Sequence, residues 1–407
     1  MNLRLLRPER SALPGCATPR LENYKTTTFF SFLQIYFIFV WFLRILLSIT
    51  MRNKIIYLLA LILLSSSCVM QPDLPSNEQS DLSGSAAYIL CEGLWGMNNS
   101  RLDALEMSSG RILENFFENA NNFRLGDVAN DIVLMGDTAF IAVSESRIIE
   151  VINIKTGKSI GRISFGENSY PRRIFIANSQ MGFVSDLYNA CIRIFNPSTL
   201  AIDDSVIPVG PAPEGICGWG QYLFVANSGY GDYLADKPKA GTISVIDIIQ
   251  MKEIAVVPAG ENPVELLIND SKLYCIYYNL PSKADSLGGI VEYSLPEMKE
   301  TRRLRCDAEK ATLSDDGSNI FYCWTEGVFK IDLNKSILQP ELIIKNPKPA
   351  EHWHSLAISP FDGSVWIGNA RNYQVKGELL IYKYKDYYSH FLKYTTGVNP
   401  TKIVFFE

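Results

Sequence analysis

The sequence predicts an all-β fold, a seven-bladed β-propeller, and three observations support it. From about residue 86 onward, short runs rich in β-branched and aromatic residues alternate with Gly, Asn, Asp and Pro, and helical periodicity is almost absent. A four-stranded plan recurs every forty-odd residues, which is typical of a propeller blade. The chain then ends on a single strand that lacks partners, as ring closure requires.

The repeat is clearest where three segments can be superimposed. "PRRIFIANSQMGFVS", "PEGICGWGQYLFVA" and "PVELLINDSKLYCI" share a plan of Pro-x-x-apolar, a short turn and a second apolar strand. One twisted four-stranded sheet cannot cover its own apolar faces, so such units stack face to face around an axis. The first position of the plan recurs at steps of 42, 42, 50, 47, 45 and 45 residues. These positions are Ala129, Pro171, Pro213, Pro263, Lys310, Ser355 and Pro400.

The two ends of the repeat region complement each other. The last segment, "PTKIVFFE", supplies one strand with no partners. Before Ala129, the segments "AAYILCEG", "SRLDALEM" and "GRILENFF" supply three strands that lack an innermost one. We therefore expect the C-terminal strand to complete the N-terminal blade and close the ring without exposed edges.

The segment "NKIIYLLALILLSSSC" predicts a lipoprotein export signal, although it starts fifty residues into the chain. Arg52 and Lys54 form a cationic head after Met51, and the apolar run 55–64 is too short to span a bilayer. Small residues then lead into Cys68, an arrangement that resembles the bacterial lipobox, in which the cysteine is acylated and becomes the mature N-terminus. The alternative is an ordinary signal peptide with an incidental cysteine.

A second apolar run, 29–50, lies directly before this signal and would, taken literally, be a transmembrane helix. Because one insertion event suffices for export, we expect Met51 to be the true initiator. The expected organisation is a spurious extension at 1–50, a lipoprotein signal peptide at 51–67, a flexible tether at 68–85 and the propeller at 86–407.

Composition excludes several classes of function. From Cys68 onward the chain carries 30 basic and 41 acidic side chains, a net charge of −11, which argues against a nucleic-acid partner. Three histidines in the whole chain are too few for a multi-copper or multi-haem site, and no GxSxG, P-loop or HExxH motif is present. The six cysteines of the propeller lie in strand-like runs without a CxxC pair, which indicates buried free thiols, with a disulfide such as Cys306–Cys323 as the alternative.

The long loops of the repeat should gather on one face. In a blade, the loop between the second and third strands shares a face with the connection to the next blade. The extra length of the long repeats falls in that loop, at 228–241, 279–289 and 369–377, whereas turns on the opposite face stay short. Long loops on one face of a rigid scaffold favour a binding site there.

This face is rich in aromatic and amide side chains, which suit a large, flat, partly polar ligand or a protein surface. The candidate ligand-binding residues are Trp95, Asn98, Asn99, Arg172, Tyr188, Asn189, Glu214, Asn227, Tyr230, Tyr233, Tyr278, Asn279, Trp324, His352, Trp353, His354, Asn369, Arg371 and Tyr373. His352 and His354 would hold a metal only if a carboxylate such as Glu214 converged on them, so neither a metal nor a cofactor is expected.

The repeats "GTISVID" and "PEGICGWGQYLFVANS" resemble the YncE-like, surface-layer-type propeller family. The opening blade, "CEGLWGMNNSRLDALEMSSGRILENFF", resembles more narrowly the lipoprotein propellers of Bacteroidetes, which are related to the cobalamin-binding BtuG surface lipoproteins. The resemblance implies an outer-membrane, lipid-anchored, non-catalytic protein that captures a nutrient, with a corrinoid such as cobalamin first, for a TonB-dependent transporter. The alternatives are a protein–protein interaction propeller of the cell envelope and a lactonase-like propeller enzyme.

The export hypothesis predicts the chemistry of the mature N-terminus. Mass spectrometry of the protein from its native membrane should find an acylated Cys68 as the first residue, and Cys68→Ser should give an unlipidated product. Peptides from upstream of Met51 would contradict the late start.

Overall fold

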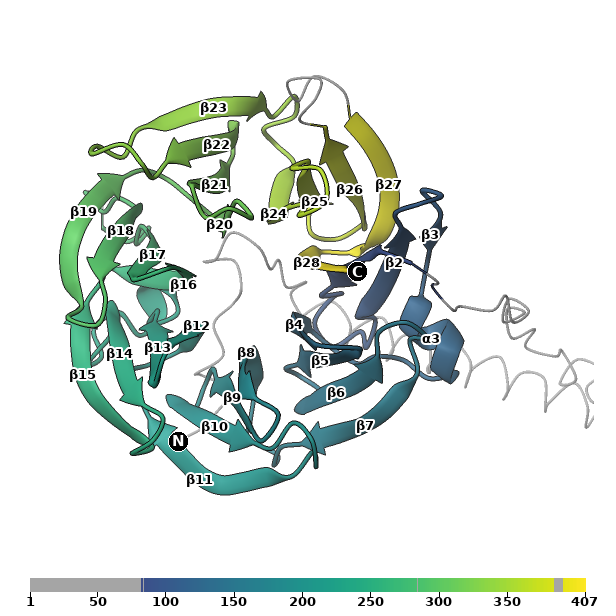
Figure 1. Ribbon diagram of the computed structural model, residues 1–407, viewed down its shortest axis with the longest axis horizontal. Coiled ribbons are helices and arrows are strands. Elements are labelled where there is room, and N and C mark those ends of the chain that lie inside the picture. Colours follow the sequence, from purple (N-terminus) through teal and green to yellow (C-terminus); the bar gives the residue numbers. More distant parts are fainter. Residues whose placement is uncertain (1–81, 83, 284, 384–390) are drawn as a thin grey trace, which may run out of the picture. The chain divides into compact units, whose positions relative to one another are not determined.

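The computed structural model describes residues 82, 84–283, 285–383 and 391–407. Within these residues, seven four-stranded antiparallel sheets form a ring (Figure 1). The chain is therefore a seven-bladed β-propeller, as the repeat predicts. The export signal, the start at Met51, the lipidation at Cys68 and nearly all of the tether lie outside the described residues. In the part of the chain that is described, no helix combines the length and the apolarity needed to cross a membrane.

Each blade runs from an innermost strand at the central channel to an outermost strand at the rim. In that order, blade 1 contains β28 (Pro400–Phe406), β1 (Ala86–Cys91), β2 (Arg101–Glu106) and β3 (Ile112–Leu113). Blade 2 contains β4 (Ala129–Met135), β5 (Thr138–Val143), β6 (Ile148–Asn153) and β7 (Ser159–Ser164). Blade 3 contains β8 (Pro171–Asn178), β9 (Met181–Asp186), β10 (Cys191–Phe195) and β11 (Ile202–Pro208). Blade 4 contains β12 (Pro213–Trp219), β13 (Tyr222–Asn227), β14 (Thr242–Asp247) and β15 (Lys252–Pro258).

The other three blades follow the same plan. Blade 5 contains β16 (Asn262–Asn269), β17 (Lys272–Tyr278), β18 (Gly289–Ser294) and β19 (Lys299–Arg305). Blade 6 contains β20 (Lys310–Leu313), β21 (Asn319–Trp324), β22 (Gly327–Asp332) and β23 (Pro340–Lys345). Blade 7 contains β24 (His352–Ile358), β25 (Val365–Arg371), β26 (Lys376–Tyr382) and β27 (Phe391–Val398). Among the described residues, two short helices lie in connections: α3 (Phe116–Asn121) and η4 (Gly231–Tyr233).

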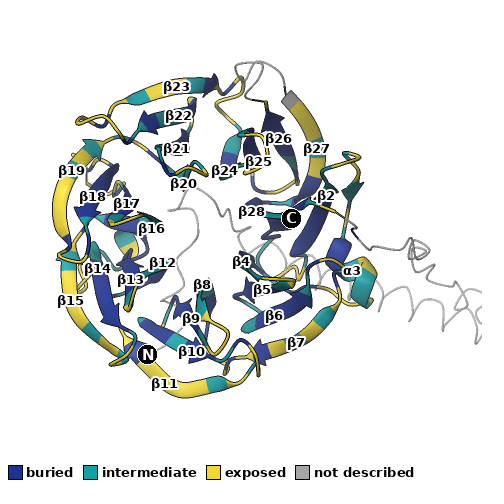
Figure 2. Cartoon of the chain, in the orientation of Figure 1, coloured by how far each residue is buried: buried dark blue, intermediate teal, exposed yellow. Residues whose placement is uncertain are grey.

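The hydrophobic core is divided among the seven blade interfaces. Strand β17 illustrates how alternation produces this division, since successive side chains of a strand point to opposite faces. Leu273 and Cys275 pack toward blade 4, whereas Tyr274 and Ile276 pack toward blade 6. Both faces of each blade are thus buried, and exposure is concentrated on outermost strands such as β11, β15 and β19 (Figure 2).

Blade 1 is closed by strands from the two ends of the repeat region, as expected. In the register of β1 with β28, Ala86 lies opposite Phe406 and Ile89 lies opposite Ile403. Ile403 is 6% exposed and packs into the interface between blades 7 and 1. The neighbouring Val404 contacts the interface between blades 1 and 2. One strand therefore completes two hydrophobic interfaces as well as one sheet.

The innermost strands carry bulges close to their first residues. The register shifts at Ala129/Asp131, Pro171/Ile174, Pro213/Ile216, Pro263/Glu265 and Trp353/Ser355. A bulge interrupts the ladder and changes the direction of the side chains beside it. The repeated bulges place polar residues around one end of the central channel.

The six described cysteines are free thiols, so the disulfide alternative is not realised. Cys91, Cys191, Cys275 and Cys323 are buried, and Cys217 and Cys306 are half-buried. Burial raises the pKa of each thiol above its ordinary value, to about 11 for Cys191 and Cys306, because the thiolate is poorly solvated there.

Removing residues 400–407 should abolish the cooperative fold. The truncation leaves an edge of β1 unpaired and exposes parts of two interfaces, at a cost on the order of 5 kcal/mol or more for four apolar side chains. Urea denaturation followed by tryptophan fluorescence would measure the loss. Deletion of Glu407 alone, which lies beyond β28, is the control and should leave the midpoint unchanged. A truncated chain that unfolds at the same urea concentration as the whole chain would contradict ring closure by β28.

Candidate functional site

One face of the ring carries the loops between the second and third strands of each blade together with the connections between blades; we call it the loop face. Among the loops between second and third strands, the longest lie between β13 and β14, where η4 forms, and between β17 and β18. The opposite face carries short turns, such as the two residues between β12 and β13. The predicted asymmetry between the two faces is present in blades 4 and 5. In blade 7 the expected long loop 369–377 is reduced to residues 372–375, because β25 ends at Arg371 and β26 starts at Lys376. The candidate residues belong to the loop face or to the channel mouth beneath it.

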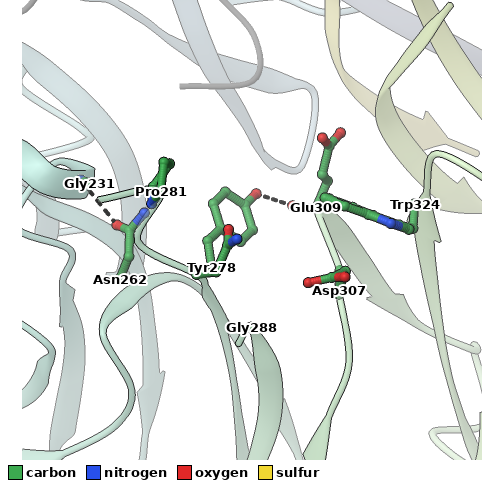
Figure 3. Close-up of a pocket in the computed structure, with 10 residues that line it drawn as sticks. Gly231, Asn262, Tyr278, Pro281, Gly288, Asp307, Glu309 and Trp324 are labelled. Atoms are coloured by element: carbon green, nitrogen blue, oxygen red, sulfur yellow. Dashed lines mark hydrogen bonds between the residues drawn. The ribbon is translucent and has the colours of Figure 1, made fainter. Parts of the chain in front are cut away.

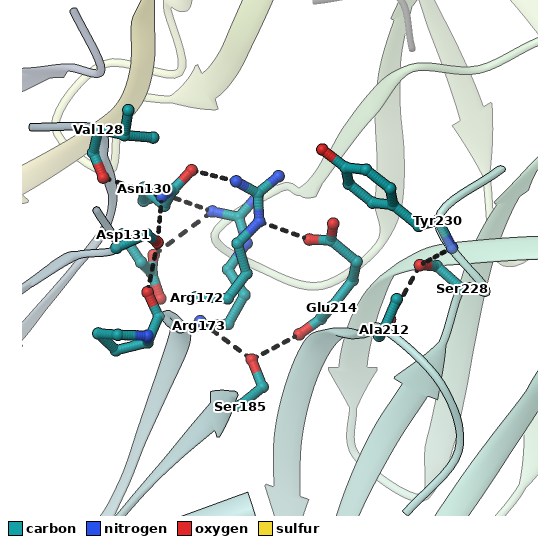
Figure 4. A network of polar contacts seen from close by, with 12 residues as sticks. Val128, Asn130, Asp131, Arg172, Arg173, Ser185, Ala212, Glu214, Ser228 and Tyr230 are labelled. Carbon is teal, nitrogen blue, oxygen red and sulfur yellow. Dashed lines mark hydrogen bonds and ion pairs between the residues drawn. The ribbon is translucent and has the colours of Figure 1, made fainter. Parts of the chain in front are cut away.

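The first group of candidate residues is a polar network at the channel mouth that links blades 2, 3 and 4 (Figure 4). Arg172 Nε donates to Glu214 Oε2 at 2.9 Å, and its Nη1 donates to Asn130 Oδ1. Glu214 is 5% exposed, so this is a nearly buried ion pair. Burial alone would lower the pKa of Arg172, but the carboxylates of Glu214 and Glu92 outweigh it and raise the pKa above its ordinary value.

The network continues through the next residue of β8. Arg173 Nη1 donates to the backbone carbonyl oxygen of Asn130 at 2.8 Å and lies 3.7 Å from Asp131 Oδ1. The hydroxyl of Ser185 accepts the Arg173 backbone N–H at 3.1 Å and donates to the Glu214 carbonyl oxygen at 3.2 Å. These contacts hold both guanidinium groups in fixed positions at the mouth of the channel.

The second group surrounds a pocket of about 60 Å³ over blades 4, 5 and 6 (Figure 3). Its lining consists of Gly231, Asn262, Tyr278, Asn279, Pro281, Gly288, Asp307, Ala308, Glu309 and Trp324. Tyr278 crosses from blade 5 to blade 6, since its hydroxyl donates to the backbone carbonyl oxygen of Glu309. Burial raises the pKa of the Glu309 carboxyl to about 7, and the nearby Lys310 offsets only part of that effect.

The third group centres on Tyr373. The ring of His352 stacks on Tyr373 at 4.7 Å between centroids, and the ring of His354 meets it edge-on at 5.4 Å. His354 Nε2 lies 3.5 Å from Glu92 Oε2. Burial lowers the pKa of both imidazoles, although Glu92 opposes the shift at His354. The two histidines do converge, but among the described residues no set of three or more His, Cys, Asp or Glu side chains is placed to hold a metal.

Several candidate residues have structural contacts. The Asn227 side chain accepts the Gly210 N–H at 2.9 Å and donates to Thr242 and Ser244. Two more candidate amides make hydrogen bonds within the fold: the Asn99 side chain accepts the Leu94 N–H, and the Asn369 side chain donates to Glu351. Tyr188 and Tyr230 belong to an aromatic cluster with Tyr170. Trp353 is buried between blades 6 and 7. The indole of Trp353 is 4% exposed, so it contributes to the core.

The other candidate residues are accessible on the loop face. Trp95, Trp324 and Arg371 are half-buried. Asn98, Asn189, Tyr233 and Asn279 are exposed. Together with the pocket around Tyr278, these side chains offer aromatic and amide contacts from blades 1, 3, 4, 5, 6 and 7.

Sequence analysis missed some of the charged residues at the channel mouth. Glu92, Asp131, Glu265, Glu309 and Lys310 were not among its candidates. For all but Glu92 a signal is present in the repeat, because they lie at or within two residues of the aligned first position of a blade, where a charged residue borders an apolar strand. Innermost strands face the channel, so polar residues there indicate channel lining even when no loop is near.

Comparison with known proteins supports the fold alone. No protein-family model matches the chain, and no curated protein matches it. The structure resembles a candidate 6-phosphogluconolactonase from Bacteroides fragilis, with 12% identity, coverage of 82% of this chain and 100% of that chain, and a TM-score of 0.59.

Two further solved structures are similar to a comparable degree. A quinonprotein alcohol dehydrogenase-like protein from Bacteroides thetaiotaomicron shows 16% identity over 80% of this chain and 79% of that chain, with a TM-score of 0.59. A second candidate 6-phosphogluconolactonase, from Bacteroides uniformis, shows 12% identity over 81% of this chain and 100% of that chain, with a TM-score of 0.56. Identities this low indicate a shared propeller and do not extend an activity to this chain.

The raised pKa of Glu309 predicts a specific pH dependence of stability. Between its ordinary value of 4.5 and its folded value of about 7, the folded state binds the proton and the unfolded state does not. Stability is therefore lost as the pH rises through this window. Glu309→Gln mimics the protonated form, so its stability relative to the natural protein should increase from pH 4 to pH 8 by at most about 3 kcal/mol.

Urea denaturation of both proteins at the two pH values tests this expectation. Glu326→Gln, which alters an exposed loop residue of the same blade, is the control and should follow the natural protein. Parallel pH dependences for Glu309→Gln and the natural protein would contradict the assignment.

Proposed function

We propose that the protein is a non-catalytic propeller that binds a nutrient on its loop face. The observation that carries this proposal is the concentration of accessible aromatic and amide side chains on that face, above a channel mouth with charged residues already fixed by ion pairs. Preformed polar groups beside aromatic surfaces are typical of ligand sites. Trp324 and Tyr278 supply the aromatic surface, and Asn279 supplies an exposed amide.

The size of the pocket constrains how a ligand would bind. A volume of about 60 Å³ lies far below the roughly 300–1,000 Å³ of pockets that enclose small molecules. A large ligand would therefore lie across the loop face and insert one substituent into the pocket. A corrinoid suits this arrangement because its ring is large and flat and its edge carries amide side chains, and it is the nutrient that we propose first.

The cellular location that we propose for the protein rests on the expected export signal. We propose that acylated Cys68 anchors the propeller in the outer membrane, on the cell surface, and that the bound nutrient passes to a TonB-dependent transporter. The tether 68–85 would allow the loop face to reach such a partner.

A second candidate function is supported by apolar residues on the same face. Met97, Tyr233, Leu287 and Val375 are 59%, 39%, 52% and 43% exposed, and each belongs to a loop between the second and third strands of its blade. Where such residues form one contiguous patch, they mark a protein partner. This alternative would make the protein an interaction module of the cell envelope. A lactonase-like activity stays a third hypothesis.

Isothermal titration with cyanocobalamin separates these hypotheses. The natural protein should release or absorb heat at micromolar ligand, and Trp95→Ala or Trp324→Ala should weaken binding tenfold or more. An aromatic anchor contributes on the order of 2 kcal/mol, and each 1.4 kcal/mol corresponds to a factor of ten.

Phe361→Ala is the matched control for the two tryptophan variants. This residue is 36% exposed in the turn between β24 and β25, on the opposite face, and its loss should leave the dissociation constant unchanged. Absence of both heat and a shift in melting temperature would remove the corrinoid proposal. If Phe361→Ala stayed folded and lost binding while both tryptophan variants bound normally, the ligand would lie on the opposite face.

A further inference from the structure

A second cavity, distinct from the pocket on the loop face, lies within the central channel. Its volume is about 130 Å³, roughly ten times the minimum that holds one water molecule. Its walls are the innermost strands of blades 1, 3, 5, 6 and 7. The lining residues are Arg173, Glu265, Leu267, Lys310, Ala311, Thr312, Ser355, Leu356, Ala357, Thr401, Lys402 and Ile403.

The charges in this lining do not balance. Arg173, Lys310 and Lys402 contribute three cationic groups, whereas Glu265 contributes one carboxylate. Glu265 Oε2 is already engaged, since it accepts the backbone N–H of Ala311 at 3.2 Å. The lining thus carries two positive charges in excess of its carboxylate.

A further carboxylate, that of Asp131, is shared between two of the cationic side chains. Its Oδ1 lies 3.7 Å from Arg173 Nη1 and 3.4 Å from Lys402 Nζ, while its Oδ2 accepts the backbone N–H of Ile174 at 2.9 Å. The single negative charge of Asp131 is therefore shared between two cationic side chains. Lys310 forms no ion pair within 4.0 Å in the described part of the chain.

The pKa of Lys310 is consistent with this imbalance. Burial is the largest effect and lowers the pKa of Lys310, and the positive charge of Arg173 lowers it further. The carboxylates of Glu265 and Glu214 raise this pKa, but they offset only part of the decrease. An anion in the cavity would lie where the protein supplies too little negative charge.

One residue of the cavity wall, Ser355, also carries a buried hydroxyl group. The hydroxyl of Ser355 is buried and makes no hydrogen bond to any described residue, and the residue is 3% exposed. A buried polar group without a partner is destabilising by about 1–3 kcal/mol unless something occupies its hydrogen-bonding position. Because this hydroxyl lies buried against Gly368, the donors that an oxyanion in the cavity would meet are the three cationic groups.

We propose that the channel cavity binds a small oxyanion of the size and charge of phosphate, held by Arg173, Lys310 and Lys402. The site adjoins the proposed nutrient site, because Arg173 also belongs to the channel mouth, but phosphate binding does not depend on nutrient binding. Arg173 is oriented by Asn130 and Asp131, so it offers its guanidinium without reorganisation. Lys310 supplies a charge that Glu265 and Glu214 offset only in part and that forms no ion pair within 4.0 Å among the described residues.

Calorimetric titration of the purified protein with inorganic phosphate, at an ionic strength kept constant with sodium chloride, tests the proposal. The natural protein should bind phosphate and show a higher melting temperature in its presence. Lys310→Met and Lys402→Met, which keep side-chain length and remove the charge, should each weaken phosphate binding tenfold or more.

Lys345→Met is the matched control, because Lys345 is exposed at the end of the outermost strand of the same blade as Lys310. It should bind phosphate as the natural protein does. Without phosphate, Lys310→Met should melt at or above the temperature of the natural protein, because it removes an unpaired cation beside Arg173. Absence of binding to the natural protein, unchanged binding by folded Lys310→Met, or an equal stabilisation by chloride would each overturn the proposal.

Discussion

The whole structure depends on burial between neighbouring blades. Each sheet has two apolar faces, and only a neighbour on each side can cover both. Strand β17 shows the consequence in one stretch of sequence, with Leu273 and Cys275 packed toward one neighbour and Tyr274 and Ile276 toward the other. A closed ring is the arrangement in which every blade has two neighbours, and β28 supplies the closure.

This division of the core leaves the channel and the loop face free for polar residues. The bulges at the starts of the innermost strands interrupt the ladder where Arg172 and Glu214 emerge. Their ion pair joins blades 3 and 4 at the channel mouth. Deeper in the channel, Asp131 is shared between Arg173 and Lys402, which come from blades 3 and 1. The rigid interfaces therefore keep the oppositely charged Arg172 and Glu214 in contact. They also keep the two cations Arg173 and Lys402 beside the same carboxylate, although like charges repel.

The fold could be predicted from the sequence because its repeat is regular and local. All seven aligned first positions, from Ala129 to Pro400, fall within the innermost strands of the structure. The face that carries the long loops could be predicted for the same reason, since loop position follows from strand order.

The individual roles of the side chains could not be predicted in this way. Asn227 and Trp353 match the pattern of ligand-binding residues, yet Asn227 ties a loop to its blade and Trp353 packs between blades. Exposure and hydrogen-bond partners depend on distant segments, such as the backbone of Gly210 for Asn227. Glu309 and Lys310 show the opposite case, because the repeat marks their positions at the start of an innermost strand but does not reveal the burial that shifts their pKa values.

The pairing of β1 with β28 also constrains the order of events during synthesis. β1 is the first described strand to be made, and its inner partner is the last. Until β28 emerges, blade 1 has an open hydrogen-bonding edge, and the interfaces on both of its sides are incomplete. Domains begin to fold during synthesis, but this ring cannot close before β28 has been made. Any process that holds back β28 therefore also holds back closure of the ring, so the chain keeps an open edge on blade 1 until its last described strand is free.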